Sequence, residues 1–397
     1  MPSPLRAVLA GVVVLVAALP SPAAAEPIAG AYIVTLSEGD PAAAAQRAER
    51  RHGAQVDHIY TQALRGYAAR MSARAAQEVA GEAGIASVVQ DQRVHADAQT
   101  LPTGVDRADA ELSATAAIDG IDRRVDADVA VLDTGIDLGH ADVKVTGGKN
   151  CQSGKGYGDG NGHGTHVAGT IAAFDNGIGV VGVAPGARLW SVRVLNSAGS
   201  GSWSSIICGV DWVTGMHSTI DVANMSLGGT GSDSACTADP LHAAICRSVG
   251  AGVTYTVAAG NEADNAANHV PAAFDEVVTV SALADFDGKP GGAGAATCRA
   301  DADDTFASFS NFGADVDLIA PGVCITSTWK GGGYKTISGT SMAAPHVAGA
   351  AALYRARNPA AAPAQVKSAL QAAGTTAWSA ADDPDGFQER LLAAGGF

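Results

Sequence analysis

One stretch decides the fold of this chain: Gly339-Thr340-Ser341-Met342-Ala343-Ala344-Pro345-His346-Val347-Ala348-Gly349, a glycine-led turn that passes into a helical run of small residues. Ser341 lies at the turn. Its small neighbours let the backbone bend sharply, and the start of a helix directs free N–H groups and the positive end of the helix dipole towards any anion formed there. Ser341 therefore has two interpretations at this point: a nucleophile beside a stabilising helix terminus, or an ordinary N-capping serine.

The composition is that of a globular protein with a strongly acidic surface. The chain has 397 residues and 47% hydrophobic content, enough for one large domain with a sizeable core and an appendage. Its net charge of −15 favours solubility and disfavours a nucleic-acid partner. Acidic side chains also suit calcium. We expect a monomer that binds no nucleic acid.

The first 25 residues have the pattern of a secretory signal. Arg6 precedes the apolar run 7–19, and after two prolines come the small residues 23–25. This order predicts cleavage after Ala25 and therefore a secreted, extracellular protein. No other apolar run approaches the roughly 20 residues that a bilayer-spanning helix requires, so the sequence predicts no membrane association.

Six cysteines lie beyond residue 98, and none forms a CxxC pair. After a secretory signal, an even number of cysteines predicts disulfides rather than metal ligands or a nucleophilic thiol. Six cysteines allow fifteen connectivities. Sequence spacing favours Cys236–Cys246 and Cys298–Cys324, which leaves Cys151–Cys208 as the third bridge.

Residues 26–97 form a small unit of their own. The pattern predicts strands at 31–36, 56–60 and 66–71, helices at 41–51 and from Ser72 to Ala83, and a final strand within 85–94. The order strand, helix, strand, strand, helix, strand is typical of a ferredoxin-like α+β domain. The unit carries no cluster of reactive side chains, so its residues alone indicate an interaction domain.

From residue 98 onward, apolar runs rich in β-branched residues alternate with glycine-rich turns and helical stretches. The runs are 128–133, 187–194, 222–225, 252–258, 277–281 and 316–319. Continuous apolar strands that alternate with helices predict an α/β three-layer sandwich, in which helices flank a mostly parallel central sheet. Functional residues of such sheets gather at the carboxyl ends of strands, and Asp133 ends the first run.

Three further motifs hold residues that acyl transfer needs. They are Asp133-Thr134-Gly135, Asn161-Gly162-His163-Gly164-Thr165-His166-Val167-Ala168-Gly169 and Ala258-Ala259-Gly260-Asn261. Each alone has another interpretation. A DTG also occurs in aspartic peptidases, which need a second such carboxylate, and the two histidines lack the glutamate of the HExxH zinc motif. Together with Ser341, the motifs supply a nucleophile, a base, a group that orients the base and an oxyanion donor.

These motifs resemble the subtilisin family of serine peptidases, including its secreted subtilisin and proteinase K branches. The resemblance covers residues 98–357 through DTG, HGTHVAGT, SLGG, AAGNE and GTSMAAPHVAG, in the family's order. It implies a subtilisin-like fold and a serine endopeptidase of broad specificity that acts on proteins and peptides. Two rival hypotheses are a binding protein that keeps the fold without turnover, and a metal hydrolase that uses His163 and His166.

The resemblance assigns roles to four residues. Ser341 attacks the scissile carbonyl, His163 accepts its proton and returns it to the leaving amine, and Asp133 orients the imidazole. The side-chain amide of Asn261 and the N–H of Ser341 stabilise the oxyanion. His166 is left without a chemical role and is expected to be a core histidine satisfied by backbone.

The resemblance also implies how substrate binds. A peptide lies extended between two backbone edges, Gly199-Ser200-Gly201 and Ser226-Leu227-Gly228, where glycines admit another main chain. Trp203 walls the pocket four residues upstream of the cut. Ala258, Ala259 and Gly260 line the primary pocket, whose open, glycine-floored form without a fixed acid at its base implies a broad preference for bulky apolar side chains.

A structural Ca²⁺ site is implied as well. The loop after the HGTHVAGT helix resembles a calcium loop of the family, and hard oxygen ligands of mixed charge suit Ca²⁺. An ordinary Asn-Gly turn is the alternative. Asp175 is expected to be a neighbour of the site. The implied ligands are the side chains of Gln99, Asp142 and Asn176 and the carbonyls of Phe174, Ile178 and Val180.

Residues 26–97 resemble the family's propeptide, an intramolecular chaperone and temporary inhibitor whose tail occupies the cleft. The resemblance places a self-processing cut between Asp97 and Ala98, so that residues 98–397 form the peptidase domain. Asp97 is an unusual residue for an apolar primary pocket.

Overall fold

The computed structural model describes residues 26–93 and 99–397. These residues form two compact units, each with a hydrophobic core of its own. The predicted signal peptide, residues 1–25, and the predicted cut between Asp97 and Ala98 lie outside the described residues.

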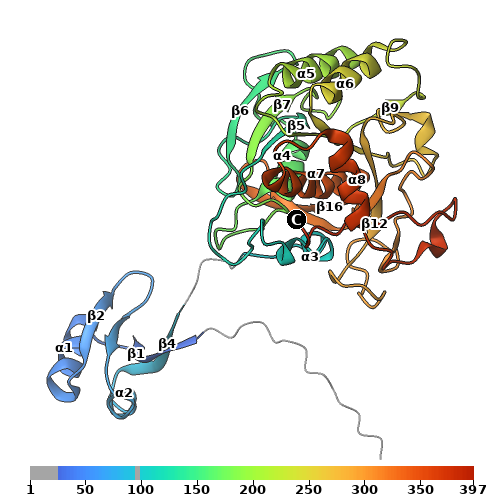
Figure 1. Ribbon diagram of the computed structural model, residues 1–397. Coiled ribbons are helices and arrows are strands. Elements are labelled where there is room, and N and C mark those ends of the chain that lie inside the picture. The colour runs from blue at the N-terminus through green and yellow to red at the C-terminus, as the bar shows by residue number, and fades with distance from the viewer. Residues whose placement is uncertain (1–25, 94–98) are drawn as a thin grey trace, which may run out of the picture. The chain divides into compact units, whose positions relative to one another are not determined.

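The first unit is a four-stranded antiparallel sheet with two helices (Figure 1). The strands lie in the order β2-β3-β1-β4. The structure thus confirms the predicted ferredoxin-like α+β arrangement. The elements are β1 (Glu26–Leu36), α1 (Pro41–His52), β2 (Gln55–Tyr60), β3 (Gly66–Arg70), α2 (Ala73–Ala80) and β4 (Ile85–Arg93).

Local signals set the helix ends in this unit. Gly53 ends α1 in the left-handed conformation, at φ 66°, where a side chain would be strained. Ser72 caps α2 as predicted, with its hydroxyl accepting from a backbone N–H one turn on. The prediction that α2 continues to Ala83 is wrong: the helix ends at Ala80 and Gly81 is its C-cap, because glycine is a poor helix former.

The second unit is built on an eight-stranded sheet in the order β13-β12-β10-β8-β5-β7-β6, with β14 also paired to β12. Every pairing is parallel except that of β12 with β13. The predicted mostly parallel sheet is therefore confirmed. The strands are β5 (Asp128–Asp133), β6 (Val145–Asn150), β7 (Arg188–Arg193), β8 (Val222–Met225), β10 (Thr254–Ala258), β12 (Val278–Ala284), β13 (Thr305–Phe306) and β14 (Leu318–Pro321).

Helices cover both faces of this sheet (Figure 1), as the sandwich prediction requires. Alternate residues of β5 show the division: Val129 and Val131 join one core, and Ala130 and Leu132 join the other. The first core contains α4 (His163–Ala172), α7 (Thr340–Arg357) and α8 (Pro363–Ala373), and the second contains α5 (Trp203–Gly215) and α6 (Pro240–Gly250).

Short elements complete the unit. They are α3 (Thr103–Arg107), η1 (Ala110–Leu112), β9 (Gly229–Thr230), η2 (Ala266–Asn268), β11 (His269–Val270), β15 (Ile325–Trp329), β16 (Gly333–Ile337) and η3 (Ala380–Asp382). The sequence analysis missed β6 and the β15–β16 hairpin. Strand β6 carries two glycines in place of an apolar pattern, and Gly147 is required there because a Cβ would lie 2.7 Å from the ring of Trp190.

Helix α7 runs through the interior of the second unit. Every residue from Met342 to Leu353 is buried, so the helix has no polar face over this length. Small residues are needed because its neighbours approach closely. A Cβ on Gly349 would lie 2.6 Å from the Cβ of Val183 and 3.4 Å from the carbonyl oxygen of Ile171 in α4.

The three predicted disulfides are confirmed. Cys151 is bonded to Cys208, Cys236 to Cys246 and Cys298 to Cys324. The first ties the end of the edge strand β6 to α5. The second closes the loop that leads into α6.

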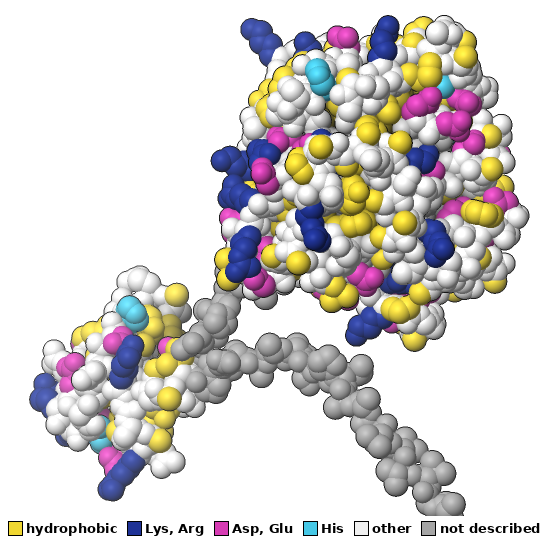
Figure 2. All heavy atoms as spheres, in the orientation of Figure 1, with side chains coloured by type: hydrophobic (Ala, Val, Ile, Leu, Met, Phe, Trp, Pro, Cys, Tyr) yellow, Lys and Arg dark blue, Asp and Glu magenta, His cyan; other side chains and the backbone are white. Residues whose placement is uncertain are grey.

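Charged side chains of both signs are interspersed over the visible face of the second unit (Figure 2), with no broad basic patch on that face. Among the residues that the structure describes, no helix combines the length and the apolarity needed to cross a bilayer.

The packing of α7 makes a stability prediction. We expect Gly349→Ala to lower the free energy of unfolding by about 1–3 kcal/mol, because the new Cβ forces Val183 out of place. Gly250→Ala is the matched control, since a Cβ there meets no atom within 4 Å. Thermal unfolding followed by circular dichroism measures both. Equal midpoints for the two variants would contradict the tight packing.

Candidate active site

Three of the four predicted catalytic side chains line the cleft of the second unit, and the fourth, Asp133, is buried in contact with His163. Asp133 is the last residue of β5, and His163 is the first residue of α4. Asn261 follows the strand β10, and Ser341 lies in the first turn of α7. Because parallel strands end at the same edge of the sheet, their C-terminal residues and the helices that begin there come together.

Asp133 and His163 form a close pair. The imidazole Nδ1 lies 2.8 Å from Oδ1 and 2.9 Å from Oδ2 of Asp133, whose side chain is fully buried. The His163 side chain is 26% exposed, so its other nitrogen is accessible from the cleft. Burial disfavours the charged imidazole, but the charge and hydrogen bond of Asp133 and the charge of Asp159 outweigh it. Together they raise the pKa of His163 above its ordinary 6.5.

Asp159 organises the loop before α4. Its Oδ1 accepts hydrogen bonds from the backbone N–H groups of Asn161 and Gly162 and from the hydroxyl of Thr134. Its Oδ2 accepts from the N–H and the hydroxyl of Thr165. The loop conformation that presents His163 is therefore fixed by one carboxylate.

The Ser341 hydroxyl lies at the first turn of α7. It donates to the carbonyl oxygen of Ser226 at 3.4 Å and makes no hydrogen bond to His163 in this rotamer. The hydroxyl of Ser226 in turn donates to the Ser341 carbonyl at 2.8 Å. Two reciprocal bonds therefore hold the backbone of Ser341 to the segment that follows β8.

Asn261 is oriented by Thr340. Both the N–H and the hydroxyl of Thr340 donate to Oδ1 of Asn261, at 2.8 and 3.1 Å. The Thr340 hydroxyl also accepts from the N–H of Gly260 at 3.1 Å. Oδ1 is thus engaged, while Nδ2 has no hydrogen bond to any described residue and is available as a donor. The exposed position of Asn261 leaves that donor at the cleft.

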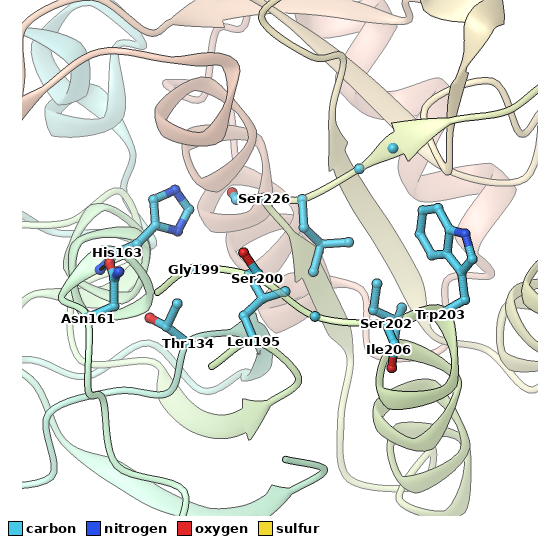
Figure 3. A pocket seen from close by; sticks show the side chains of 14 residues that line it. Thr134, Asn161, His163, Leu195, Gly199, Ser200, Ser202, Trp203, Ile206 and Ser226 are labelled. Carbon is cyan, nitrogen blue, oxygen red and sulfur yellow. Dashed lines mark hydrogen bonds between the residues drawn. The ribbon is translucent and has the colours of Figure 1, made fainter. Parts of the chain in front are cut away.

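Two adjoining pockets open at these residues. The larger, about 670 Å³, contains His163 and Trp203 at opposite ends (Figure 3). The ring of Trp203 packs beside Gly229, where a Cβ would lie 3.0 Å from it. Seven predicted substrate residues line this pocket: Gly199, Ser200, Gly201, Trp203, Ser226, Leu227 and Gly228.

The smaller pocket, about 240 Å³, contains Asn261 and Ser341. The remaining predicted substrate residues, Ala258, Ala259 and Gly260, line it. Glu262, whose side chain is 56% exposed, and His269 also line this pocket. Glu262 ends the AAGNE motif but was given no role, and His269, in the short strand β11, lies outside every motif.

His166 is a core residue, as expected. Its Nε2 lies 3.0 Å from the carbonyl oxygens of both Ile325 and Lys335. Burial lowers its pKa to about 3, although both backbone contacts oppose this shift. A fully buried imidazole bound to backbone is not placed to hold a catalytic metal with His163.

Most of the predicted calcium ligands converge on one site. The Gln99 amide contacts the carbonyl oxygens of Phe174 and Val180, the latter at 2.9 Å. The Asn176 amide lies 3.1 Å from Oδ1 of Asp142, a fully buried carboxylate. Ile178 contacts this group through its N–H, which donates to Asn176 Oδ1 at 3.0 Å. A buried carboxylate beside backbone carbonyls matches the donor chemistry of Ca²⁺.

Asp175 is a neighbour of this loop, as expected. Its Oδ2 accepts from the N–H groups of Asp119 and Gly120 at 2.7 and 2.8 Å. The carboxylate therefore caps a surface turn and is engaged away from the convergent donors.

A second group of carboxylates could hold a metal ion. Asp285, Asp287 and Asp303 each place one oxygen within 4.8 Å of the others. Arg107 lies 3.2 Å from Oδ2 of Asp285 and supplies a positive charge there. The similar group around His242 is different in kind, because its two cysteines are joined in a disulfide.

Comparisons with known proteins show the family of this chain. Residues 126–390 match the Subtilase family, Peptidase S8, and residues 31–97 match Peptidase inhibitor I9. Subtilisin DY of Bacillus licheniformis is 41% identical over 237 residues, which cover 59% of this chain and 78% of that protein. Subtilisin E of Bacillus subtilis strain 168 is 38% identical over 314 residues, covering 78% and 75%.

An extracellular serine proteinase of Thermus sp. strain Rt41A is 39% identical over 333 residues, which cover 80% of this chain and 73% of that protein. The crystal structure of a cold adapted subtilisin-like serine proteinase matches with a TM-score of 0.58 at 36% identity. That match covers 74% of this chain and 98% of the other.

The Asp133–His163 pair makes a prediction about proton binding. NMR titration of histidine-labelled protein should give His163 a pKa above 6.5, and Asp133→Asn should bring it below 6.5, because burial then acts without the opposing carboxylate. Asp126→Asn, which removes an exposed carboxylate that lies two residues before β5 and pairs with Arg188, should leave the value unchanged. An unshifted His163 in the Asp133→Asn protein would refute the electrostatic argument.

Proposed function

The chain belongs to the subtilase family of serine endopeptidases, and from that premise we propose that Ser341, His163 and Asp133 are the residues that cleave the peptide bond. The observation that carries this assignment is the Asp133–His163 pair, at 2.8 Å, held beside the cleft that Ser341 also reaches. These are the residue types and roles that acyl transfer requires.

In this mechanism the hydroxyl of Ser341 first turns from the Ser226 carbonyl towards His163, a rotation about one side-chain bond. Nε2 of His163 accepts the proton as the oxygen attacks the scissile carbonyl, and the imidazolium then protonates the leaving amine. Water attacks the acyl-enzyme by the same proton route. Asp133 keeps Nδ1 protonated and stabilises the imidazolium throughout.

The oxyanion receives two donors. One is Nδ2 of Asn261, oriented because Thr340 occupies Oδ1 of the same amide. The other is the N–H of Ser341, which lies in the first turn of α7, where backbone N–H groups lack helical partners. Donors fixed before the reaction lower the barrier without reorganising during it.

We propose that substrate lies extended along 199–201 and 226–228, with main-chain bonds to both edges. Trp203 then bounds the pocket for the residue four positions upstream of the cut. Ala258, Ala259 and Gly260 contact the side chain that precedes the scissile bond. Apolar walls of this kind support broad specificity for bulky side chains.

The N-terminal unit is a propeptide inhibitor domain of the I9 family. We propose that residues 26–97 act as an intramolecular inhibitor whose tail occupies the cleft until the enzyme cuts between Asp97 and Ala98, leaving residues 98–397 as the mature, monomeric peptidase. The predicted signal at 1–25, the three disulfides and an extracellular relative support secretion.

A structural Ca²⁺ is proposed at the convergent donors of Gln99, Asp142 and Asn176 and the carbonyls of Phe174, Ile178 and Val180. The support is the buried charge of Asp142 and the carbonyl oxygens already gathered beside the Gln99 amide. A bound cation would neutralise that carboxylate and join the start of the mature chain to the loop after α4.

The assignment of the nucleophile and oxyanion donor is tested by substitution. Ser341→Ala should abolish propeptide processing, casein hydrolysis and labelling by a fluorophosphonate. Asn261→Ala should lower kcat by about 10²–10³ with KM little changed, a magnitude known from a member of this family rather than derived from this structure. A Ser341→Ala protein that still processed itself and cleaved casein would refute the proposal.

Calcium binding is tested by unfolding of the fluorophosphonate-inhibited enzyme. At free Ca²⁺ of a hundred times Kd, binding contributes about 2.7 kcal/mol, so EGTA should lower Tm by roughly 5–10 °C. Asp142→Asn should lose most of this response, while Asp126→Asn should retain it. A Tm that does not depend on Ca²⁺ in the unsubstituted enzyme would rule the site out.

A further inference from the structure

Two buried carboxylates near the C-terminus take no part in the proposed mechanism. Asp383 directly follows η3, and Glu389 lies where the chain returns to pair with Ile319 of β14. Glu389 is 1% exposed and Asp383 is 7% exposed. Acidic side chains are almost never buried to this degree unless they are paired. A partner for these two groups is therefore expected.

The described residues supply these carboxylates with almost no donors. Both oxygens of Glu389 are buried and accept no hydrogen bond, and the same holds for Oδ2 of Asp383. Oδ1 of Asp383 is engaged, because it accepts from the N–H of Asp385 at 3.3 Å. No basic side chain that the structure describes forms an ion pair with either group. Three buried carboxylate oxygens are thus left without a partner.

Negative charge is concentrated at this point. The carboxyl groups of Asp383 and Glu389 interact directly, and the charge of Asp385 acts on both. Burial, together with these like charges, raises the pKa of Glu389, and burial is also the main cause that raises the pKa of Asp383. The ionised pair is therefore unfavourable unless a positive charge enters the site.

A shared proton and a metal ion are two ways to relieve this repulsion. One proton between Asp383 and Glu389 would engage one oxygen of each group, so the second oxygen of Glu389 would stay buried without a donor. A metal ion can bind both oxygens of Glu389 and Oδ2 of Asp383 at once. The number of unpartnered oxygens therefore favours a metal ion over a proton.

We propose that Asp383 and Glu389 bind a Ca²⁺ ion, with Asp385 adding negative charge from the exposed side of the site. Oxygen ligands alone suit hard cations, and Ca²⁺ readily accepts a bidentate carboxylate. Mg²⁺ usually keeps several water molecules, which a pair of buried carboxylates accommodates less well. The site shares no residue with the one proposed at Asp142.

The ion would fasten the C-terminal loop to the sheet. The indole of Trp378 donates to the carbonyl oxygen of Glu389 at 3.0 Å, and Trp378 packs with Ile319 and Leu391 in a small hydrophobic cluster separate from the two main cores. Segments held by few apolar contacts open locally at a lower cost than the core. We therefore expect the ion to oppose local opening of residues 379–391 more than global unfolding.

The test counts bound Ca²⁺ in the full chain that carries Ser341→Ala and Asp142→Asn, which should prevent self-digestion and remove the other proposed site. Equilibrium dialysis against radioactive calcium should find one ion per chain fewer after Glu389→Gln or Asp383→Asn. Because the indole of Trp378 contacts Glu389, Tb³⁺ in place of Ca²⁺ should show tryptophan-sensitised luminescence that both variants lose. The count needs no turnover, so its outcome is independent of the proposed function.

Hydrogen exchange measures the effect on the loop. At free Ca²⁺ of a hundred times Kd, exchange of residues 379–391 in the parent should slow by at least about tenfold. Glu389→Gln should lose this response. Its amide can donate to Asp383 as a protonated acid would, so a shared proton predicts instead that exchange stays slow in this variant without Ca²⁺.

Asp382→Asn is the matched control, because it removes an exposed carboxylate next to Asp383. It should keep both the ion and the response of the loop, and circular dichroism should show that all variants are folded. A parent that binds no Ca²⁺, or variants of Asp383 and Glu389 that bind as much as the parent, would overturn the proposal. An equal loss in Asp382→Asn, or slow exchange of Glu389→Gln without Ca²⁺, would also overturn it.

Discussion

Helices α4 and α7 both begin beside the cleft, because small side chains let them pack closely against each other and against the sheet. In this protein α4 and α7 share one core, and α7 is built from alanine, glycine and other small residues over its buried length. Gly349 has no room for a Cβ beside Val183. The first turns of the two helices therefore bring His163 and Ser341 to the edge where β5 and β10 end. The proposed chemistry depends on this packing before it depends on any reactive group.

A network of short polar contacts then joins the three segments at that edge. Thr340 holds both Asn261 and the N–H of Gly260, and Ser226 and Ser341 bond reciprocally. Because the segments after β8 and β10 and the first turn of α7 each supply a partner, the side chain of Asn261 and the backbone of Ser341 have little freedom to move independently. Such a site needs little reorganisation during a reaction, which is the main electrostatic advantage that a folded protein has over water.

The sequence predicted the sheet, its two helical layers and the propeptide fold, because long apolar runs and helix caps are local signals. It did not predict β6, where glycines replace the apolar pattern, or the end of α2 at Ala80. At the site, the motif residues Asp133, His163, Asn261 and Ser341 could be selected in advance because each lies in a distinctive short pattern. Thr340 and Asp159 could not be assigned roles, since their contacts with Asn261 and Thr134 join segments that are separate in the chain.

Gln99 stands two positions beyond the bond at which the propeptide is expected to leave, and its amide already contacts the carbonyls of Phe174 and Val180. Thr100 continues the attachment by donating to Gly179 at 2.7 Å. The first described residues of the second unit are therefore attached to the loop that follows α4. The position of the scissile bond also determines how many side chains can bind the proposed Ca²⁺. A cut after Gln99 would remove the side-chain oxygen of that residue from the site.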